Sequence, residues 1–323
     1  MRRILLYNPS LSTLNIGDRI IVESAKKELS PILDNAFVVD VSTHLPVSIN
    51  YAKILANSGF DYRFVLGTNL LMGNLFRRFR QWDINLMNAK MLGPCILMGA
   101  GWWQYNDEPN AMTKQIYQRI LSHDGLHSVR DEYTANQLKK CGFNNVLVTS
   151  CPTMWQFTPE FTSTIPKSKG SIVCTTITDY RKDINADRKM LSLLTANYDR
   201  VYLWLQGIGD ADYYSVLKKE IAGPDKISFV SPTVEAWDNI LSKPDIDYVG
   251  TRLHAGIRAL QHKRRTIIIA VDNRALEKKK SFNLTVLERK NMDILNEMIN
   301  SDITTEIRLP ITEIEKWKRS LTK

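Results

Sequence analysis

The sequence has few residues of the kinds that bind metals or form disulfides. Its 323 residues include four cysteines and five histidines, and no two cysteines form a Cys-x-x-Cys pair. The histidines other than His254 have no acidic or histidine neighbours at the spacing of metal ligands, so we expect no bound metal. Cys95 and Cys174 lie in apolar, strand-like runs, which predicts buried free thiols and a reducing compartment.

Long apolar runs are absent as well. No segment approaches the roughly 20 apolar residues that a membrane-spanning helix needs. The first apolar segment covers only residues 4–7 before Asn8 and Pro9 end it, which argues against a secretion signal. We therefore expect a cytoplasmic protein in which any membrane contact is peripheral, at the inner face of the membrane.

Acidic residues are outnumbered by basic ones. The chain has 34 Asp and Glu against 43 Lys and Arg, which gives a formal net charge of +9. This excess predicts a partner that is nucleic acid, a phosphorylated small molecule or an anionic membrane. The basic residues are scattered, with no basic face that carries interleaved aromatics, so we expect no nucleic acid. The basic run at residues 262–265 favours a solvated turn over a docking patch for anionic lipid.

The glycine motifs of nucleotide-binding loops are also missing. A polar loop after the first strand leads into Asn15-Ile16-Gly17-Asp18, which opens a helix that we expect to reach about Leu29. This spacing matches neither Gly-x-Gly-x-x-Gly nor a Walker loop with its lysine. A strand, a polar loop and a helix N-terminus still form a corner that favours anions. The alternative is that Asp18 is an ordinary first-turn carboxylate that interacts with the helix dipole.

Strand-like runs alternate with helical segments along most of the chain, which indicates repeated βαβ units and parallel sheets. The length favours two domains. Residues 151–170 break the alternation with three prolines and many Ser and Thr, so we interpret them as a connector. We expect an N-terminal α/β domain over residues 1–155, a C-terminal α/β domain over residues 165–323, and a last helix at 312–321 that packs back on the first domain.

Residues 247–274 have the pattern of a strand, a helix and a second strand. Leu253, Ile257 and Leu260 recur on one helical face, and Thr251 is the expected N-cap. The helix N-terminus and the next strand end should share one edge of the sheet, where open α/β sheets bind ligands. Arg252, His254 and Arg274 should therefore converge there, with His254 placed for acid chemistry on an anionic substrate.

Other strand ends carry further candidates. Arg130 follows a short strand, where its planar fork could clamp a phosphate or carboxylate; the alternative is a surface pair with Asp131 or Glu132. The turns at residues 67–69 and 99–103 are glycine-containing, and either they let backbone approach a ligand or they are plain βα turns. The tryptophans in the second turn could stack on a sugar or belong to the core.

A series of short motifs, weak one by one, extends over nearly the whole chain. It consists of Asn15-Ile16-Gly17-Asp18, Gly67, Gly93-Pro94 with Gly99 and Gly101, Ser128-Val129-Arg130-Asp131, Cys151-Pro152-Thr153, and Arg252-Leu253-His254-Ala255 followed by Asp272 and Arg274. The order and spacing of the series resemble the polysaccharide pyruvyl transferase family. The family implies a fold of two Rossmann-like parallel-sheet domains that face a cleft, similar to GT-B glycosyltransferases.

The resemblance also implies a reaction. Phosphoenolpyruvate would be the donor, without any other cofactor, and a pyruvate ketal would form on two hydroxyls of one sugar. The acceptor would be a surface polysaccharide, such as a capsule or exopolysaccharide, or its lipid-linked precursor. We expect His254 to protonate the enol carbon and Asp18 to deprotonate the acceptor. The substrate-binding residues would be Asn15, Gly17, Arg130, Arg252 and Arg274. We expect the N-terminal domain, with Arg130, to form the acceptor side, and the C-terminal domain to hold the donor site at Arg252-Leu253-His254.

Two features depart from the family, and two other functions compete with it. Lysine is common in the family where this chain has Arg274, which keeps the charge but cannot share a proton, so we expect it only to bind. The turn at residues 67–69 contains less glycine than the family's. The main alternative is a GT-B-type sugar-nucleotide glycosyltransferase, in which Asp272 or Glu277 would contact a ribose. The other is a non-catalytic basic binding module, which the scattered charge disfavours.

Overall fold

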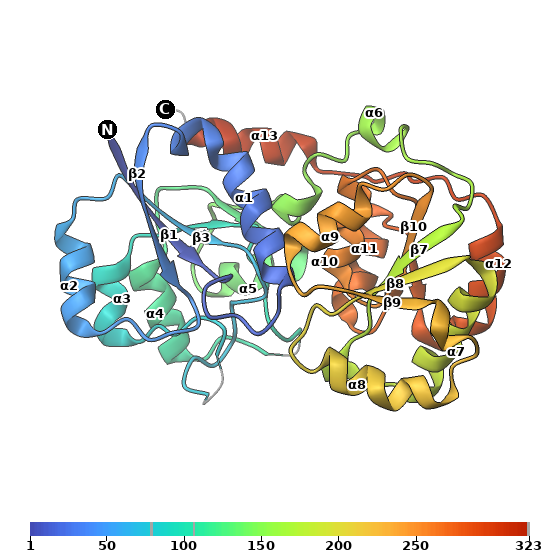
Figure 1. Cartoon of the computed structure of the whole chain (residues 1–323). Coiled ribbons are helices and arrows are strands. Elements are labelled where there is room, and N and C mark those ends of the chain that lie inside the picture. The colour runs from blue at the N-terminus through green and yellow to red at the C-terminus, as the bar shows by residue number, and fades with distance from the viewer. Residues whose placement is uncertain (78–79, 106, 322–323) are drawn as a thin grey trace. The chain divides into compact units, whose positions relative to one another are not determined.

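The computed structural model describes residues 1–77, 80–105 and 107–321, and they form two compact units (Figure 1). The boundary between Trp155 and Gln156 lies within the segment that we expected to connect two domains. Residues 14–20, which we expected in the first domain, group instead with the second unit. The first unit comprises Met1–Thr13, Ile21–Trp155 and Leu309–Lys323, and the second comprises Leu14–Ile20 and Gln156–Arg308.

Parallel strands form the centre of the first unit. Four of them lie in the order β2-β1-β3-β4, and β5 pairs with β6 in a separate parallel ladder. A bridge between Ala100 and Val129 links the end of β4 to β5. The strands are β1 (Arg2–Asn8), β2 (Ala36–Ser42), β3 (Tyr62–Leu66), β4 (Ile96–Met98), β5 (His127–Val129) and β6 (Val146–Val148).

Both faces of this first sheet are buried, which explains the continuous apolar run of β1. Leu5 and Tyr7 join a core on one face, while Ile4 and Leu6 join a second core on the other face. The helices of the unit are α1 (Gly17–Leu33), which begins in the second unit, α2 (Ile49–Asn57), α3 (Leu86–Leu92), α4 (Ala111–Ile120), α5 (Glu132–Lys140) and α13 (Ile311–Ser320).

Helix α13 comes from the end of the chain but belongs to the first unit. Figure 1 shows it beside α1, and an ion pair joins Lys318 to Glu28 at 2.7 Å. Trp317 is fully buried, and its indole nitrogen donates to the Leu126 carbonyl at 2.9 Å. These contacts give the last segment of the chain a defined place in the core of this unit.

The second unit is built on a six-stranded parallel sheet in the order β12-β11-β10-β7-β8-β9. Its strands are β7 (Ile172–Thr175), β8 (Arg200–Trp204), β9 (Ile227–Val230), β10 (Ile246–Gly250), β11 (Thr266–Ala270) and β12 (Val286–Glu288). Its helices are α6 (Pro159–Thr162), α7 (Ile184–Asn197), α8 (Asp210–Leu217), α9 (Val234–Leu241), α10 (Leu253–Gln261), α11 (Asn273–Phe282) and α12 (Leu295–Asn300). Short 3₁₀ turns lie between these elements, namely η2 (Asp179–Arg181), η3 (Lys218–Glu220), η4 (Pro224–Lys226) and η5 (Arg289–Ile294), whereas η1 (Pro152–Met154) belongs to the first unit.

The predicted strand–helix–strand unit is present as β10, α10 and β11. Leu253, Ile257 and Leu260 are buried, as the periodicity predicts. A Cβ at Gly256 would lie 2.6 Å from Ile268 Cγ1, so glycine lets α10 lie close to its sheet. The N-cap prediction was wrong, because the cap residue is Arg252, without a side-chain capping bond, and the Thr251 hydroxyl bonds toward β7.

The basic run at residues 262–265 is not simply a solvated turn. Arg265 is only 1% exposed, and its Nη1 pairs with Asp247 at 2.8 Å while its other nitrogens donate to backbone carbonyls. His262 bonds to Asp238 at 3.1 Å. Burial favours raising the pKa of Asp238, but hydrogen bonds from Arg258 and His262 lower it to about 2. Half of this run therefore stabilises the fold.

The four cysteines are all buried, as predicted for Cys95 and Cys174. Burial raises the pKa of the Cys95 thiol, and it also raises that of Cys174.

Among the described residues, no helix is both long enough and apolar enough to cross a membrane.

Candidate functional site

In the first unit, Arg130 lies at the carboxyl end of β5, where the sequence places it. Its side chain is buried, with 5% of its surface exposed. Nε donates to the Gly99 carbonyl at 3.2 Å and Nη1 donates to Asn69 Oδ1 at 2.7 Å, while Nη2 faces Cys151 Sγ at 4.0 Å. Every one of these partners is an uncharged acceptor.

No carboxylate in the described parts of the chain forms an ion pair with Arg130. The Asp131 carboxylate, which we considered as its partner, caps α5 by accepting from the Thr134 amide at 2.8 Å, and it accepts from the Tyr105 hydroxyl. Burying a charge without a counter-ion lowers the stability of the folded protein by an amount on the order of several kcal/mol, because the ion loses its hydration. An anionic ligand would remove that cost, so Arg130 has the setting of an anion-binding residue.

Glycine at position 101 makes room for this guanidinium. A Cβ there would lie 2.5 Å from Arg130 Cδ and 2.4 Å from Asn69 Oδ1. At Gly67, by contrast, a Cβ would lie 2.2 Å from the Gly99 carbonyl oxygen. Gly67 therefore allows two strand ends to pack together, which is the plain-turn alternative for residues 67–69.

The tryptophans after β4 do not form a sugar platform together. Trp102 is fully buried, and its Nε1 donates to the Asp107 carbonyl at 2.7 Å. Trp103 is partly buried and packs against the same core. The core alternative is therefore right for Trp102.

In the second unit, Arg252 is a buried residue that already has acidic partners. Its Nη2 lies 2.8 Å from Asp179 Oδ1 and 2.5 Å from Asp210 Oδ1, and its Nε donates to the Ile177 carbonyl. Burial raises the pKa of Asp210, although Arg252 opposes that change. Arg252 thus differs from Arg130, because two carboxylates offset its charge before any ligand binds.

Tyr180, on the turn η2, connects the two arginines that we expected to converge. The Arg252 guanidinium lies 5.0 Å from the centroid of its ring, and Arg274 Nη2 donates to its hydroxyl at 2.6 Å. Arg274 also pairs with Asp272 at 2.5 Å. Burial favours a higher pKa for Asp272, yet Arg274 lowers it below its ordinary value. The structure therefore brings Arg252 and Arg274 together around Tyr180, and each arginine is paired with at least one carboxylate.

His254 lies on the first turn of α10, two residues after Arg252, and is 6% exposed. The helix N-terminus at this point presents amide groups that favour anions. The position agrees with the predicted strand edge, and it places His254 on the helix turn that Arg252 begins.

The candidate residues Asn15 and Gly17 contact a turn after β8. Asn15 Oδ1 accepts from Gln206 Nε2 at 2.7 Å, and a Cβ at Gly17 would lie 2.6 Å from that same nitrogen. Asp18 lies half-buried in the first turn of α1. Asp210 extends this network, since its Oδ2 accepts from the Gln206 and Gly207 amides at 3.0 and 2.7 Å.

The sequence already indicated the turn at residues 206–210, since it follows a strand, but sequence reasoning missed Asp179 and Tyr180. These two follow β7 at the carboxyl edge of the sheet, which is the one local signal that could have identified them. In the described residues, no group of three or more His, Cys, Asp or Glu is arranged to hold a metal ion.

The sequence is similar to a known family over most of its length. A model of the polysaccharide pyruvyl transferase family matches residues 15–273. The chain belongs to this family. The match begins at Asn15, includes Asp18, Arg130, Arg252 and His254, and ends one residue before Arg274. The pyruvyl transferase family implies a transferase that acts in polysaccharide biosynthesis.

The fold of this family member resembles solved GT-B-like proteins. One is the Methanocaldococcus jannaschii UDP-GlcNAc 2-epimerase in complex with UDP-GlcNAc and UDP (12% identity, 99% of this chain and 98% of that chain, TM-score 0.56). Another is the apo form of the lipopolysaccharide outer core galactosyltransferase WaaB (9% identity, 100% and 98%, TM-score 0.52). These similarities confirm the predicted α/β fold class with parallel sheets. A search of curated proteins found no match.

Proposed function

We propose that this protein transfers the pyruvyl group of phosphoenolpyruvate to two hydroxyls of one sugar, forming a pyruvate ketal on a surface polysaccharide or its lipid-linked precursor. Family membership supports a pyruvyl transferase. The observation that carries the donor assignment is Arg130, a buried guanidinium whose hydrogen-bond partners in the described parts of the chain are all uncharged. Phosphoenolpyruvate offers a carboxylate and a phosphate, and both match the planar fork of an arginine.

The reaction needs one acid and one base. Protonation of the enol carbon C3 leaves an oxocarbenium-like centre at C2, and a sugar hydroxyl attacks this carbon and loses its proton. The C2–O bond to phosphate then breaks, the second hydroxyl attacks C2, and the proton of that hydroxyl passes to the phosphate, which leaves as inorganic hydrogen phosphate. We assign the proton donor to His254, because an imidazole is the most common general acid in enzymes and this one lies on the first turn of α10 at the carboxyl edge of the sheet. Asp18 is our candidate for the base that deprotonates the acceptor.

The two remaining arginines have a different part in this proposal. Arg252 and Arg274 are paired with acids in the ligand-free protein, so donor anions would have to compete with Asp179, Asp210 and Asp272. We infer that they hold the turns at the carboxyl edge of the second unit's sheet in place more than they clamp a donor anion. Gln206 is a further candidate for substrate contact, since its Oε1 is buried and has no hydrogen-bond partner in the described parts of the chain.

Thermal denaturation with phosphoenolpyruvate, UDP-sugars and GDP-sugars tests the donor. A ligand at 100 times its Kd stabilises the folded state by about 2.7 kcal/mol. We expect phosphoenolpyruvate to raise the Tm of the wild type and of Arg119→Gln, an exposed control in the same unit, but not of Arg130→Gln. Stabilisation by a nucleotide sugar and none by phosphoenolpyruvate would support the glycosyltransferase alternative instead.

The acid assignment has its own test. His254→Gln should abolish acceptor-dependent phosphate release while phosphoenolpyruvate still raises the Tm of the variant. Near-normal release of phosphate by His254→Gln would remove His254 from the mechanism. Loss of both the release and the Tm response, in a folded variant, would show that His254 binds the donor and is not its acid.

A further inference from the structure

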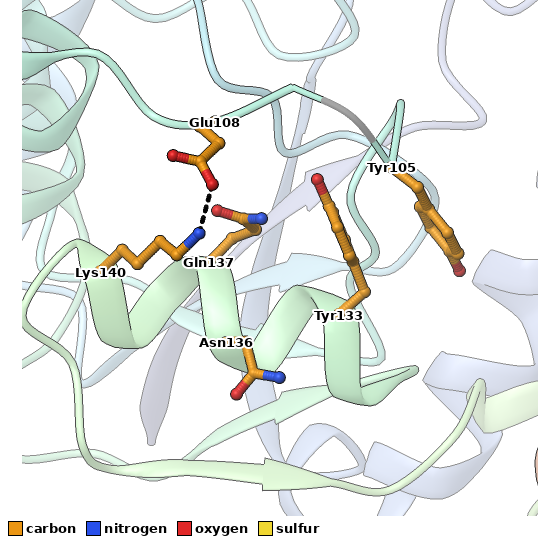
Figure 2. A pocket seen from close by; sticks show the side chains of 6 residues that line it. All are labelled: Tyr105, Glu108, Tyr133, Asn136, Gln137 and Lys140. Carbon is orange, nitrogen blue, oxygen red and sulfur yellow. Dashed lines mark hydrogen bonds and ion pairs between the residues drawn. The ribbon is translucent and has the colours of Figure 1, made fainter.

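A surface pocket of about 640 Å³ lies along α5 in the first unit (Figure 2). None of its lining residues has a part in the chemistry proposed above. Its floor is a single face of the helix, because four of the residues recur at i, i+3, i+4 and i+7. The lining consists of Tyr105, Glu108, Tyr133, Asn136, Gln137 and Lys140.

Two stacked tyrosines form one side of the pocket. The rings of Tyr105 and Tyr133 have centroids 4.6 Å apart and an interplanar angle of 17°. The Tyr105 hydroxyl donates to Asp131 Oδ2 at 2.9 Å, which fixes that ring to the N-cap of α5. An aromatic face with polar groups beside it suits the apolar face of a sugar ring, whose hydroxyls lie at its edge.

A buried polar side chain lies next to this platform. Gln137 is only 3% exposed, and its Oε1 has no hydrogen-bond partner among the described residues. Figure 2 shows its amide between the Tyr133 ring and the pair formed by Lys140 and Glu108. A buried acceptor without a donor costs free energy, and a ligand hydroxyl in the pocket would supply that donor. The exposed amide of Asn136 is a second hydrogen-bonding group on the same face.

The charges in the pocket cancel, which selects against an anion. Lys140 Nζ lies 2.5 Å from Glu108 Oε1, and these two are the only charged residues in the lining. The segment that carries Glu108 is held in place, because a Cβ at Gly73 would lie 2.2 Å from the Glu108 carbonyl oxygen. A phosphate or uronate would find no uncompensated cation here, in contrast to the setting of Arg130.

We propose that this pocket binds a neutral sugar unit of the acceptor glycan. The link to an acceptor rests on the proposed function, whereas the fit to a neutral sugar rests on the tyrosine stack, the unpartnered Gln137 oxygen and the cancelled charge. Asn136 and Gln137 bond the hydroxyls, and Tyr133 packs on the ring.

Saturation-transfer NMR with lactose, cellobiose, maltose and N,N′-diacetylchitobiose tests the pocket on the full chain. We expect at least one disaccharide to bind the wild type and Tyr51→Ala, a control at an exposed tyrosine on α2. Tyr133→Ala and Gln137→Leu should each weaken binding by about tenfold or more. If Tyr133→Ala does not fold by circular dichroism, Gln137→Leu and the exposed Asn136→Ala decide the result. Absence of binding to the wild type, or equal binding by the folded variants, overturns the proposal.

The same samples separate this proposal from the proposed function. A Tm response to phosphoenolpyruvate without disaccharide binding overturns the sugar pocket and leaves the transferase proposal in place. Disaccharide binding that the pocket variants lose, without any response to phosphoenolpyruvate, supports the pocket and overturns the donor assignment.

Discussion

Arg252 and Asp210 form an ion pair in which both side chains are buried. Arg252 Nη2 lies 2.5 Å from Asp210 Oδ1, and the two side chains are 3% and 0% exposed. The other carboxylate oxygen of Asp210 accepts from the Gln206 and Gly207 amides. The pair therefore joins the N-terminus of α10 to the turn after β8. Its loss should lower the free energy of unfolding more than it lowers the rate of the reaction.

We expect Asp210→Asn to lower the free energy of unfolding by about 3 kcal/mol, because it leaves a buried guanidinium with one carboxylate fewer. Urea denaturation measures the change. Asp212→Asn is the matched control, since Asp212 lies exposed in the same first turn of α8. Equal urea midpoints for the two variants would show that Asp179 alone compensates Arg252.

Arg130→Met should change donor binding and leave stability unharmed. It removes a buried charge that has no acidic partner, so the ligand-free protein should be at least as stable as the wild type, while the response to phosphoenolpyruvate disappears. Arg252→Met should destabilise the fold, because it leaves Asp210 buried without its cation. Urea midpoints and phosphoenolpyruvate titrations of both variants test this contrast, and a marked loss of stability in Arg130→Met would contradict it.

Gly101→Ala should weaken donor binding by displacing Arg130, although position 101 itself supplies no side chain that could bind the donor. The added Cβ would lie 2.5 Å from Arg130 Cδ, so the arginine must move. Overpacking of this kind costs about 1–3 kcal/mol, and displacement of the guanidinium should raise the Kd for phosphoenolpyruvate by roughly tenfold, or about 1.4 kcal/mol. Calorimetric titration gives the Kd, and an unchanged value would show that Arg130 does not need its present position.

Stability should fall with acidification because of His127. Burial lowers the pKa of His127 from 6.5 to about 4. Between these values the unfolded chain binds a proton that the folded protein does not, so stability is present above pH 6.5 and is lost as the pH falls toward 4. The loss should be about 3 kcal/mol. Urea midpoints across this range should depend less on pH in His127→Gln than in the wild type or the control His44→Gln.

The parallel sheets could be predicted because their strands are buried on both faces, as at residues 266–270 and in β1. The positions of Arg130, Arg252 and His254 could also be predicted, since each follows a strand whose end lies at the ligand-binding edge. Local patterns suffice for such features.

The pairing of Arg252 with its two acids could not be predicted from local patterns. Asp179 and Asp210 come from turns after β7 and β8, and they reach Arg252 only because the sheet places β7 next to β10 and β8 next to β7. For the same reason Thr251 is not a cap, since its hydroxyl bonds to Thr178 and to the Thr176 carbonyl in the segment that follows β7. Strand order is a long-range property that one segment does not encode.

The division of the chain into interleaved segments limits how the protein can be recombined. Residues 14–20 group with the second unit and residues 309–323 with the first, although each is covalently continuous with the other unit. A chimera that exchanges only residues 1–155 would separate Asn15 from its Gln206 partner and Trp317 from the Leu126 carbonyl. A working exchange of acceptor specificity must therefore move residues 309–323 together with the first unit and keep 14–20 with the second.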